Sequence, residues 1–179
     1  MDNRLLSQTK LIIERKLTMN KIFLSTTIAL LLTIILASTT FAAPAAGERQ
    51  LLLKGSLEAT ETHVVTPPTM LVDGNASGTA TQLGAFTMSF QGEVYLPTLF
   101  AAYESAILVS ADGASIYAEG SGQGTLTETP GIVSIVETYT ITGGTGRFAG
   151  ASGSFIVERL VDRATLASSG TISGTIVLP

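Results

Sequence analysis

The sequence predicts an all-β protein, a closed antiparallel barrel of about eight strands that follows an N-terminal signal peptide. Three observations support this fold class. Apolar and polar residues alternate at period two along several segments after residue 50. Turn signals rich in glycine, proline, asparagine and aspartate separate these segments at short, even intervals. Glycines also repeat on one face of two segments, as is typical of strands that bend into a closed barrel.

The composition excludes several classes of function. The chain of 179 residues has no cysteine, so it has neither disulfides nor thiolate sites. Residues 1–42 carry five basic and two acidic side chains, whereas residues 43–179 carry five basic and twelve acidic ones. Nucleic acids and anionic membrane surfaces require basic patches, so we expect neither as a partner of this acidic domain. No spacing typical of metal ligands occurs, and we expect no metal and no cofactor.

The N-terminal residues predict a signal peptide. Lys21 precedes an apolar run that ends at Ala37, and small residues lead to Ala42. Cleavage after Ala42 and cleavage after Ala45 both fit this pattern. Met19 is a plausible initiator, which would make residues 1–18 a start-site artefact; the alternative is a long region before the apolar run.

This leader sets the expected domain organisation and destination. The signal peptide covers residues 1–42, a linker covers 43–49 and the barrel domain covers 50–179. The apolar run is short for a span of about 20 residues, so we expect no stable membrane anchor after cleavage. The mature protein is predicted to be exported through the general secretory route, to the periplasm or the exterior.

The first half of the domain contains the clearest alternation. Residues 51–65 alternate and end at Pro67-Pro68, because proline cannot donate to a strand ladder. Residues 73–78, DGNASG, are predicted to form a turn. Residues 86–96 alternate again, with Phe86, Met88 and Phe90 on one face. For residues 99–106 we expect a brief helical turn at most.

The second half continues the same pattern. Asp112-Gly113 predicts a hairpin, and Thr129-Pro130-Gly131 predicts another turn. Between them, residues 115–124 carry three glycines on one parity. The remaining strands are expected near residues 133–141, 155–161 and 166–178.

Residues 140–155, TITGGTGRFAGASGSF, have the most specific residue order in the chain. The run Ile141–Phe148, followed by Ala151-Ser152-Gly153, resembles a motif shared by plant allene oxide cyclases and dirigent proteins. Both families are eight-stranded barrels, usually with a cavity for an apolar or aromatic ligand. The resemblance therefore implies such a barrel, in a bacterial secreted branch of this superfamily. The cysteine of the cyclase site, the Pro-Phe-Thr-Asn-like segment and the dirigent histidine–aspartate pair have no counterpart here, so the resemblance covers the loop and not the catalytic residues.

The loop itself is expected to be structural. Its glycines allow a tight path, Phe148 can fill the end of the barrel, and Arg147 can bind loop carbonyls or a carboxylate. A phosphate-binding loop would need a following helix and a Lys-Ser/Thr pair, which are missing. The residues assigned to this structural loop are Gly143, Gly144, Gly146, Arg147, Phe148 and Gly153.

The candidate ligand-binding residues are the ionisable and polar side chains on apolar parities, namely Glu61, His63, Glu137, Tyr139 and Arg159. A buried charge is costly unless it is paired. Glu137 and Arg159 lie on successive strands and could face each other, either inside a cavity or as an ion pair at the surface or barrel mouth. His63 with Glu61 could form a dyad or half of a metal site, or His63 could lie at the surface where its strand ends. We identify no catalytic residue.

Three functions remain open from the sequence. The protein could bind a small hydrophobic ligand or a protein partner without catalysis, which the lack of a catalytic signature favours. It could be an isomerase or cyclase that acts on a hydrophobic substrate inside the barrel through Glu137 or Tyr139. It could be an oligomeric surface or matrix protein whose Thr- and Ser-rich strand faces pack between subunits. A homo-oligomer is a further expectation.

Overall fold

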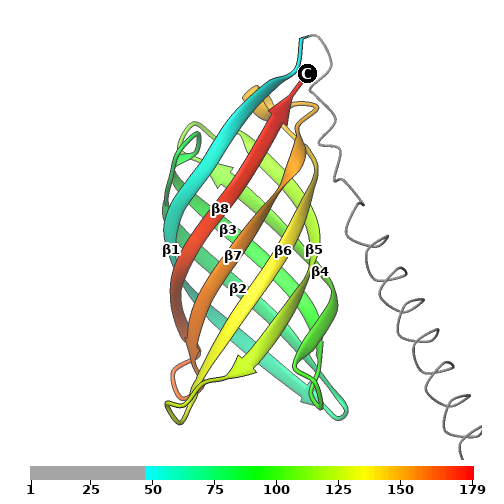
Figure 1. Ribbon diagram of the computed structural model, residues 1–179, viewed down its shortest axis with the longest axis vertical. Coiled ribbons are helices and arrows are strands. Elements are labelled where there is room, and N and C mark those ends of the chain that lie inside the picture. The colour runs from blue at the N-terminus through cyan, green and yellow to red at the C-terminus, as the bar shows by residue number, and fades with distance from the viewer. Residues whose placement is uncertain (1–46) are drawn as a thin grey trace, which may run out of the picture. The chain divides into compact units, whose positions relative to one another are not determined.

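The computed structural model describes residues 47–179, which form one closed antiparallel β-barrel (Figure 1). Eight strands follow one another around the barrel in chain order, and β8 pairs with β1 to close it. The predicted fold class is therefore confirmed, whereas the predicted leader lies outside the described residues. The strands are β1 Arg49–Thr66, β2 Thr69–Ala80, β3 Gly84–Tyr95, β4 Phe100–Ser110, β5 Ser115–Leu126, β6 Ile132–Gly144, β7 Ser152–Asp162 and β8 Ala167–Leu178.

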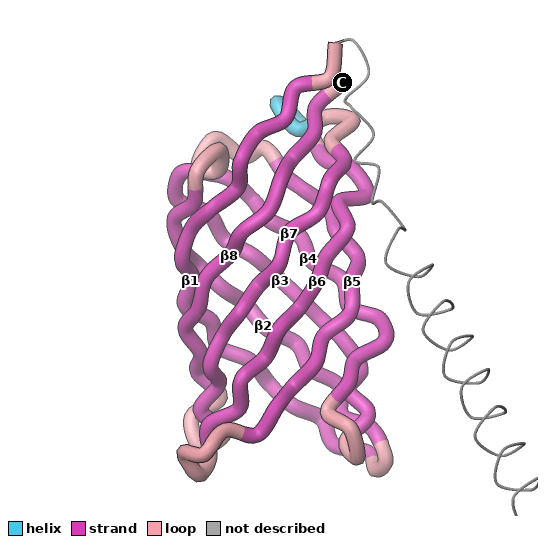
Figure 2. The backbone as a smooth tube through the Cα atoms, in the orientation of Figure 1, coloured by secondary structure: helices cyan, strands magenta, loops and turns pink. Residues whose placement is uncertain are grey.

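The strands are tilted and joined by short connections at the two ends of the barrel (Figure 2). The β1–β2, β3–β4, β5–β6 and β7–β8 connections share one end, at the bottom of Figure 2, which we call the mouth. The β2–β3, β4–β5 and β6–β7 connections share the other, which we call the loop end. Within residues 47–179 no helix has the length and hydrophobicity to cross a membrane.

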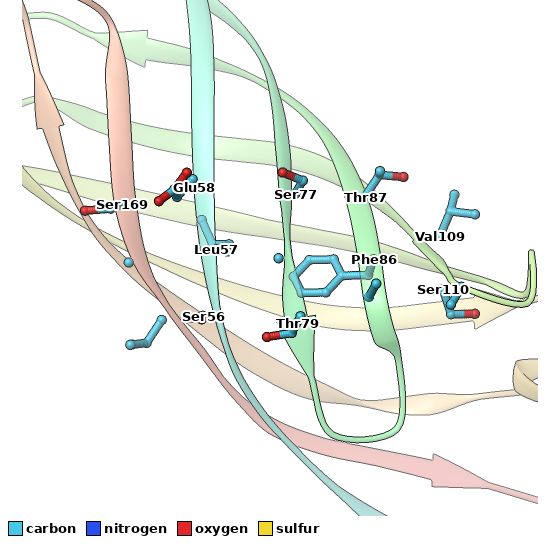
Figure 3. Close-up of a pocket in the computed structure, with 15 residues that line it drawn as sticks. Ser56, Leu57, Glu58, Ser77, Thr79, Phe86, Thr87, Val109, Ser110 and Ser169 are labelled. Carbon is cyan, nitrogen blue, oxygen red and sulfur yellow. The ribbon is translucent and has the colours of Figure 1, made fainter.

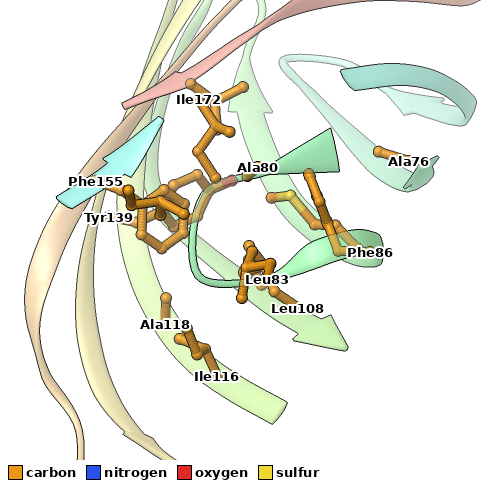
Figure 4. Packing of buried hydrophobic residues seen from close by; sticks show 14 of the residues in the cluster. Ala76, Ala80, Leu83, Phe86, Leu108, Ile116, Ala118, Tyr139, Phe155 and Ile172 are labelled. Carbon is orange, nitrogen blue, oxygen red and sulfur yellow. The ribbon is translucent and has the colours of Figure 1, made fainter. Parts of the chain in front are cut away.

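The alternation in the sequence places one parity of each strand in the core. Leu53 and Leu57 of β1 are buried, as are Phe86 and Met88 of β3 and Val157 of β7. These side chains belong to one hydrophobic cluster that fills the barrel toward the loop end (Figure 4). The cluster includes Leu108, Ile116 and Ile172 from three strands and Leu83 from the β2–β3 connection.

The glycine-rich loop caps this filled end. A single 3-10 turn, η1 (Gly146–Phe148), follows β6, and Phe148 is 1% exposed within the core cluster. Arg147 donates a hydrogen bond to the Gln82 carbonyl at 2.6 Å and forms an ion pair with Asp112 at 3.1 Å. These contacts tie the β6–β7 connection to the β2–β3 and β4–β5 connections. The loop residues thus lie at the end of the barrel and link its three connections there.

Residues 73–78 are not a turn, contrary to the prediction. They lie inside β2, where Gly74 pairs with Phe90 of β3. The Phe90 ring occupies the space that a side chain at Gly74 would need. The small residues of this segment therefore make room for an aromatic ring in the interior, which is a reason for glycine in a strand as well as in a turn.

The helical turn expected at residues 99–106 is also wrong, because β4 begins at Phe100. The β4–β5 register shifts between Ala101 and Glu104, and the β3–β4 register shifts at the same level. This irregularity breaks the period-two alternation, and for that reason the sequence pattern did not predict a strand here.

Candidate functional site

A cavity of about 640 Å³ occupies the mouth half of the barrel. Its wall near the mouth is largely apolar, formed by Val65, Met70, Val94, Leu96, Leu99, Leu126, Val133, Ile135, Val161 and Leu166. Its deeper wall carries Glu61, His63, Phe90, Glu104, Glu137 and Arg159. Of the five candidate residues, Glu61, His63, Glu137 and Arg159 line this cavity.

The outer face of the barrel has a shallow hollow over β8, β1, β2, β3 and the end of β4 (Figure 3). Small hydroxyl side chains such as Ser56, Ser77 and Thr87 surround it, and Glu58 is the ionisable residue there. It lacks the convergent charged groups of the interior, so the interior cavity is the better candidate site.

Arg159 organises the deep wall of the cavity. Its Nη2 donates to Glu137 Oε1 at 2.7 Å and its Nε donates to Glu137 Oε2 at 3.1 Å. Its Nη1 donates to Glu61 Oε2 at 3.0 Å and to the Ser168 hydroxyl at 3.3 Å. Its guanidinium carbon lies 4.8 Å from the centroid of the Phe90 ring. The side chain thus connects β7 to β6, β1, β8 and β3.

The strand register explains why these charges meet. Arg159 pairs with Ile135 of β6, so Glu137 is its diagonal neighbour on the inner face. Arg159 is 5% exposed and Glu137 2% exposed, and the interpretation of this pair as a surface ion pair is therefore wrong. Burial by itself would lower the pKa of Arg159, but hydrogen bonding and attraction from Glu137 and then Glu61 outweigh it and raise that pKa.

His63 lies next to Glu61 on the inner face of β1, with its Nε2 at 3.4 Å from Glu61 Oε1. Its side chain is 20% exposed and lines the cavity. Across residues 47–179 no group of three His, Cys, Asp or Glu side chains is placed to hold a metal ion. The pair therefore forms no metal site with a third ligand in this part of the chain, where His63 Nε2 makes no hydrogen bond.

Glu104 is a cavity residue that the sequence reasoning missed. It is buried on β4 and pairs with Gly92 of β3 and Gly120 of β5. A Cβ placed on Gly92 would lie 2.8 Å from Glu104 Cγ, and one on Gly122 would lie 2.6 Å from Glu104 Oε1. Glycines on both neighbouring strands therefore leave the space that this carboxyl group fills.

A sequence signal for Glu104 existed. It shares parity with Ala106, Leu108 and Ser110, all of which are buried. The signal was hidden because the bulge after Ala101 interrupts the alternation just before Glu104.

The environment of Glu104 favours its neutral form. Burial, followed by repulsion from Glu137, raises the pKa of Glu104 to about 8. Attraction to Arg159 and the nearby Tyr139 hydroxyl oppose this rise, and Glu61 adds to it. Near neutral pH the group is therefore mostly a carboxylic acid with a proton to donate.

Tyr139 lies beneath the cavity, at its border with the core. Its ring stacks on Phe155 with 5.0 Å between the ring centroids, and the two residues lie together in Figure 4. Burial and then repulsion from Glu137 raise the pKa of its hydroxyl, so it remains a neutral donor. Tyr139 pairs with Gly120, the residue that also pairs with Glu104. This arrangement places Tyr139 and Glu104 on either side of a glycine.

Two solved structures show what this barrel resembles. The pterocarpan synthase dirigent protein GePTS1 matches 79% of this chain and 95% of its own, with a TM-score of 0.54 and 14% identity. The pterocarpan synthase dirigent protein PsPTS1 matches 72% of this chain and 94% of its own, with a TM-score of 0.47 and 15% identity. The match to GePTS1 shows that the chain has a dirigent-like barrel fold, as its motif predicted. The bacterial branch stays a prediction.

Comparison of the sequence with known protein families gives no matching family model, and no curated protein matches it either. The likeness thus rests on the fold, and the chemistry has to be argued from the cavity itself.

Proposed function

We propose that the mature protein is an exported barrel that binds a small hydrophobic ligand in the mouth cavity. The observation that carries this proposal is the cavity of about 640 Å³ with its apolar entrance and few convergent polar groups. Small-molecule sites in proteins have this character and volumes of roughly 300–1,000 Å³. The fold shared with a pterocarpan synthase dirigent protein is consistent with a ligand or substrate inside the barrel. The export route rests on the predicted leader.

A pair of variants tests the use of the cavity. Val133 and Val136 lie on the same strand, β6, but Val133 lines the cavity whereas Val136 is 41% exposed on the outer face. Val133→Phe should fill part of the cavity and weaken ligand binding at least tenfold, while Val136→Phe should leave binding unchanged.

The measurement has two steps. Native mass spectrometry of the protein from its source cells seeks a co-purifying ligand, and thermal shift across lipids and phenolic compounds seeks others. Wild-type protein without a bound ligand and without any shift across the panel would contradict the proposal, as would equal binding by both variants.

An isomerase or cyclase in the same cavity is the second candidate. It is favoured by Glu104, whose pKa of about 8 suits a group that gives and takes a proton near neutral pH. Incubation of the co-purified ligand in deuterated buffer should then give a rearranged or deuterated product with wild-type protein and none with Glu104→Gln. An unchanged ligand in both reactions would contradict the catalytic function, and only the binding function would remain.

A homo-oligomeric assembly is proposed alongside these functions. Apolar side chains are exposed on the outer face of the barrel, among them Leu71, Ile107 and Leu160. The native mass also measures the oligomeric state, and a strictly monomeric mass would contradict this proposal.

A further inference from the structure

Two buried polar groups in the site, the Tyr139 hydroxyl and the Glu104 carboxyl group, lie close enough to affect each other's pKa. Tyr139 is fully buried and Glu104 is 8% exposed. Among the described residues, neither the Tyr139 hydroxyl nor Glu104 Oε2 makes a hydrogen bond. A buried polar group without a hydrogen bond is costly and uncommon, so a place where two such groups adjoin calls for a functional explanation.

The geometry brings these donors to one place. Glu104 and Tyr139 flank Gly120 in the strand register, and a Cβ on Gly120 would lie 2.8 Å from Tyr139 Cδ1. Glu104 lines the cavity, and its carboxyl group fills the space that a side chain on Gly122 would need. The glycines of β5 thus let the Glu104 carboxyl group and the Tyr139 ring pack against this strand, with Glu104 lining the cavity and Tyr139 beneath it.

The charged groups nearby do not offer an anion site. The hydrogen bonds of Arg159 go to Glu137, Glu61 and Ser168, so its charge is already neutralised by protein carboxylates. With two carboxylates and one guanidinium, this cluster carries excess negative charge, and His63 faces Glu61 rather than the floor. Arg163, the other cation that lines the cavity, is exposed at the mouth. At the floor an anionic group would be repelled by the carboxylates, whereas an uncharged oxygen acceptor would meet two donors.

The cavity also fixes a direction for the ligand. Apart from Arg163, which is exposed at the mouth, its charged groups lie deep, and apolar residues lie between them and the mouth. A ligand with one oxygen and an apolar body would place the oxygen at the floor and the body against side chains such as Val94 and Val133.

We propose that Glu104 and Tyr139 form a neutral two-donor subsite that receives the carbonyl oxygen of a ketone or similar uncharged carbonyl compound. The proposal rests on the proposed function, because it names the ligand class of the same cavity. Each donor contributes one O–H group, and together they would hold the oxygen while the apolar body occupies the rest of the cavity.

Three probes with one carbon skeleton test the subsite: acetylnaphthalene, ethylnaphthalene and naphthylethylamine. They present a ketone, a hydrocarbon and a cation, respectively. Affinities are measured by fluorescence titration with wild type, Tyr139→Phe and Glu104→Gln. The infrared stretch of a carbonyl-labelled ketone reports hydrogen bonding directly. Binding of the hydrocarbon shows that each variant still forms the cavity.

We expect Tyr139→Phe to weaken ketone binding roughly three- to tenfold, as the loss of one hydrogen bond does, without weakening hydrocarbon binding. The carbonyl stretch should shift to lower frequency in wild type and shift less in the variant. Ketone affinity should fall as the pH rises through about 8, because Glu104 then loses the proton that it donates to the ketone. The titratable and charged groups around Glu104 are Glu137, Glu61, Arg159, Tyr139 and His63. Glu104→Gln should remove this pH dependence.

Each failure has a separate signature. An unshifted carbonyl stretch, with the same ketone-to-hydrocarbon affinity ratio in all three proteins, would overturn the subsite and leave hydrophobic binding intact. Amine binding that exceeds ketone binding and strengthens with pH would overturn it in favour of a cation site at ionised Glu104. Failure of all three probes, the hydrocarbon included, would count against the proposed function together with the subsite.

Discussion

Arg159 holds buried carboxylates on two other strands, Glu137 on β6 and Glu61 on β1. Replacing it by methionine would leave both carboxylates buried without their cation. We expect Arg159→Met to lower the free energy of unfolding by about 3–5 kcal/mol, measured by urea denaturation. Arg163 is the control, since it is exposed at the mouth, and Arg163→Met should change stability by less than about 0.5 kcal/mol. Similar losses in both variants would show that the buried network is not the cause.

Glu104 gives the protein a pH dependence of known sign. Its pKa is about 8 in the folded protein, against an ordinary value of 4.5. Between these values the folded state keeps a proton that the unfolded state has lost. The free energy of unfolding therefore falls as pH rises through this interval, by at most about 1.4 kcal/mol per pH unit from this group. Glu104→Gln cannot titrate, so its stability relative to wild type should increase with pH across the interval. Urea denaturation at a series of pH values measures this, and a relative gain by wild type would refute it.

At the scale of single elements, the glycine at the start of β7 has a demanding position. Gly153 has a φ of +117°, and a Cβ there would strike the Thr175 carbonyl oxygen of β8. Gly131, in the β5–β6 turn, also has a positive φ, of +85°, but has open space around it. We expect Gly153→Ala to cost about 3 kcal/mol or more and Gly131→Ala about 1–2 kcal/mol in thermal unfolding. Equal losses of stability in the two variants would mean that backbone strain alone causes the loss, and that the contact with β8 contributes nothing.

The elements also show what the sequence could predict. Alternation identified Glu61, Glu137 and Arg159 as polar residues on apolar faces, and the cavity contains all three. It could not tell which face is interior, because that depends on how distant strands close the barrel. It missed Glu104 because a bulge is set by neighbouring strands and not by local pattern. Residues 73–78 were predicted to form a turn because glycine is common both in turns and in strands that pass close to an aromatic ring.

At the scale of the whole molecule, the barrel is filled at the loop end and hollow at the mouth. Phe148 lies in the filled half, far along the strands from the mouth residues. Phe148→Ala should lower the free energy of unfolding by about 3–5 kcal/mol, because a large buried side chain is lost. Tyr103→Ala is the control, since that ring is 58% exposed. The affinity for a cavity probe should be the same in both folded variants, and a loss confined to Phe148→Ala would show that the two halves are coupled.

The order of the strands has a kinetic consequence. Seven of the eight strand pairings join segments that follow each other in the chain, and only β1 with β8 joins segments from opposite ends of the domain. Local pairings form early and distant ones late, so this seam should close last in folding. Arg159 of β7 donates a hydrogen bond to Ser168 of β8 on the near side of this seam and another to Glu61 of β1 on the far side, so the Arg159–Glu61 contact crosses it. Residues that line the cavity thus also hold the barrel closed. Because the β1–β8 pairing forms last, its amide hydrogens should be the first to exchange with solvent.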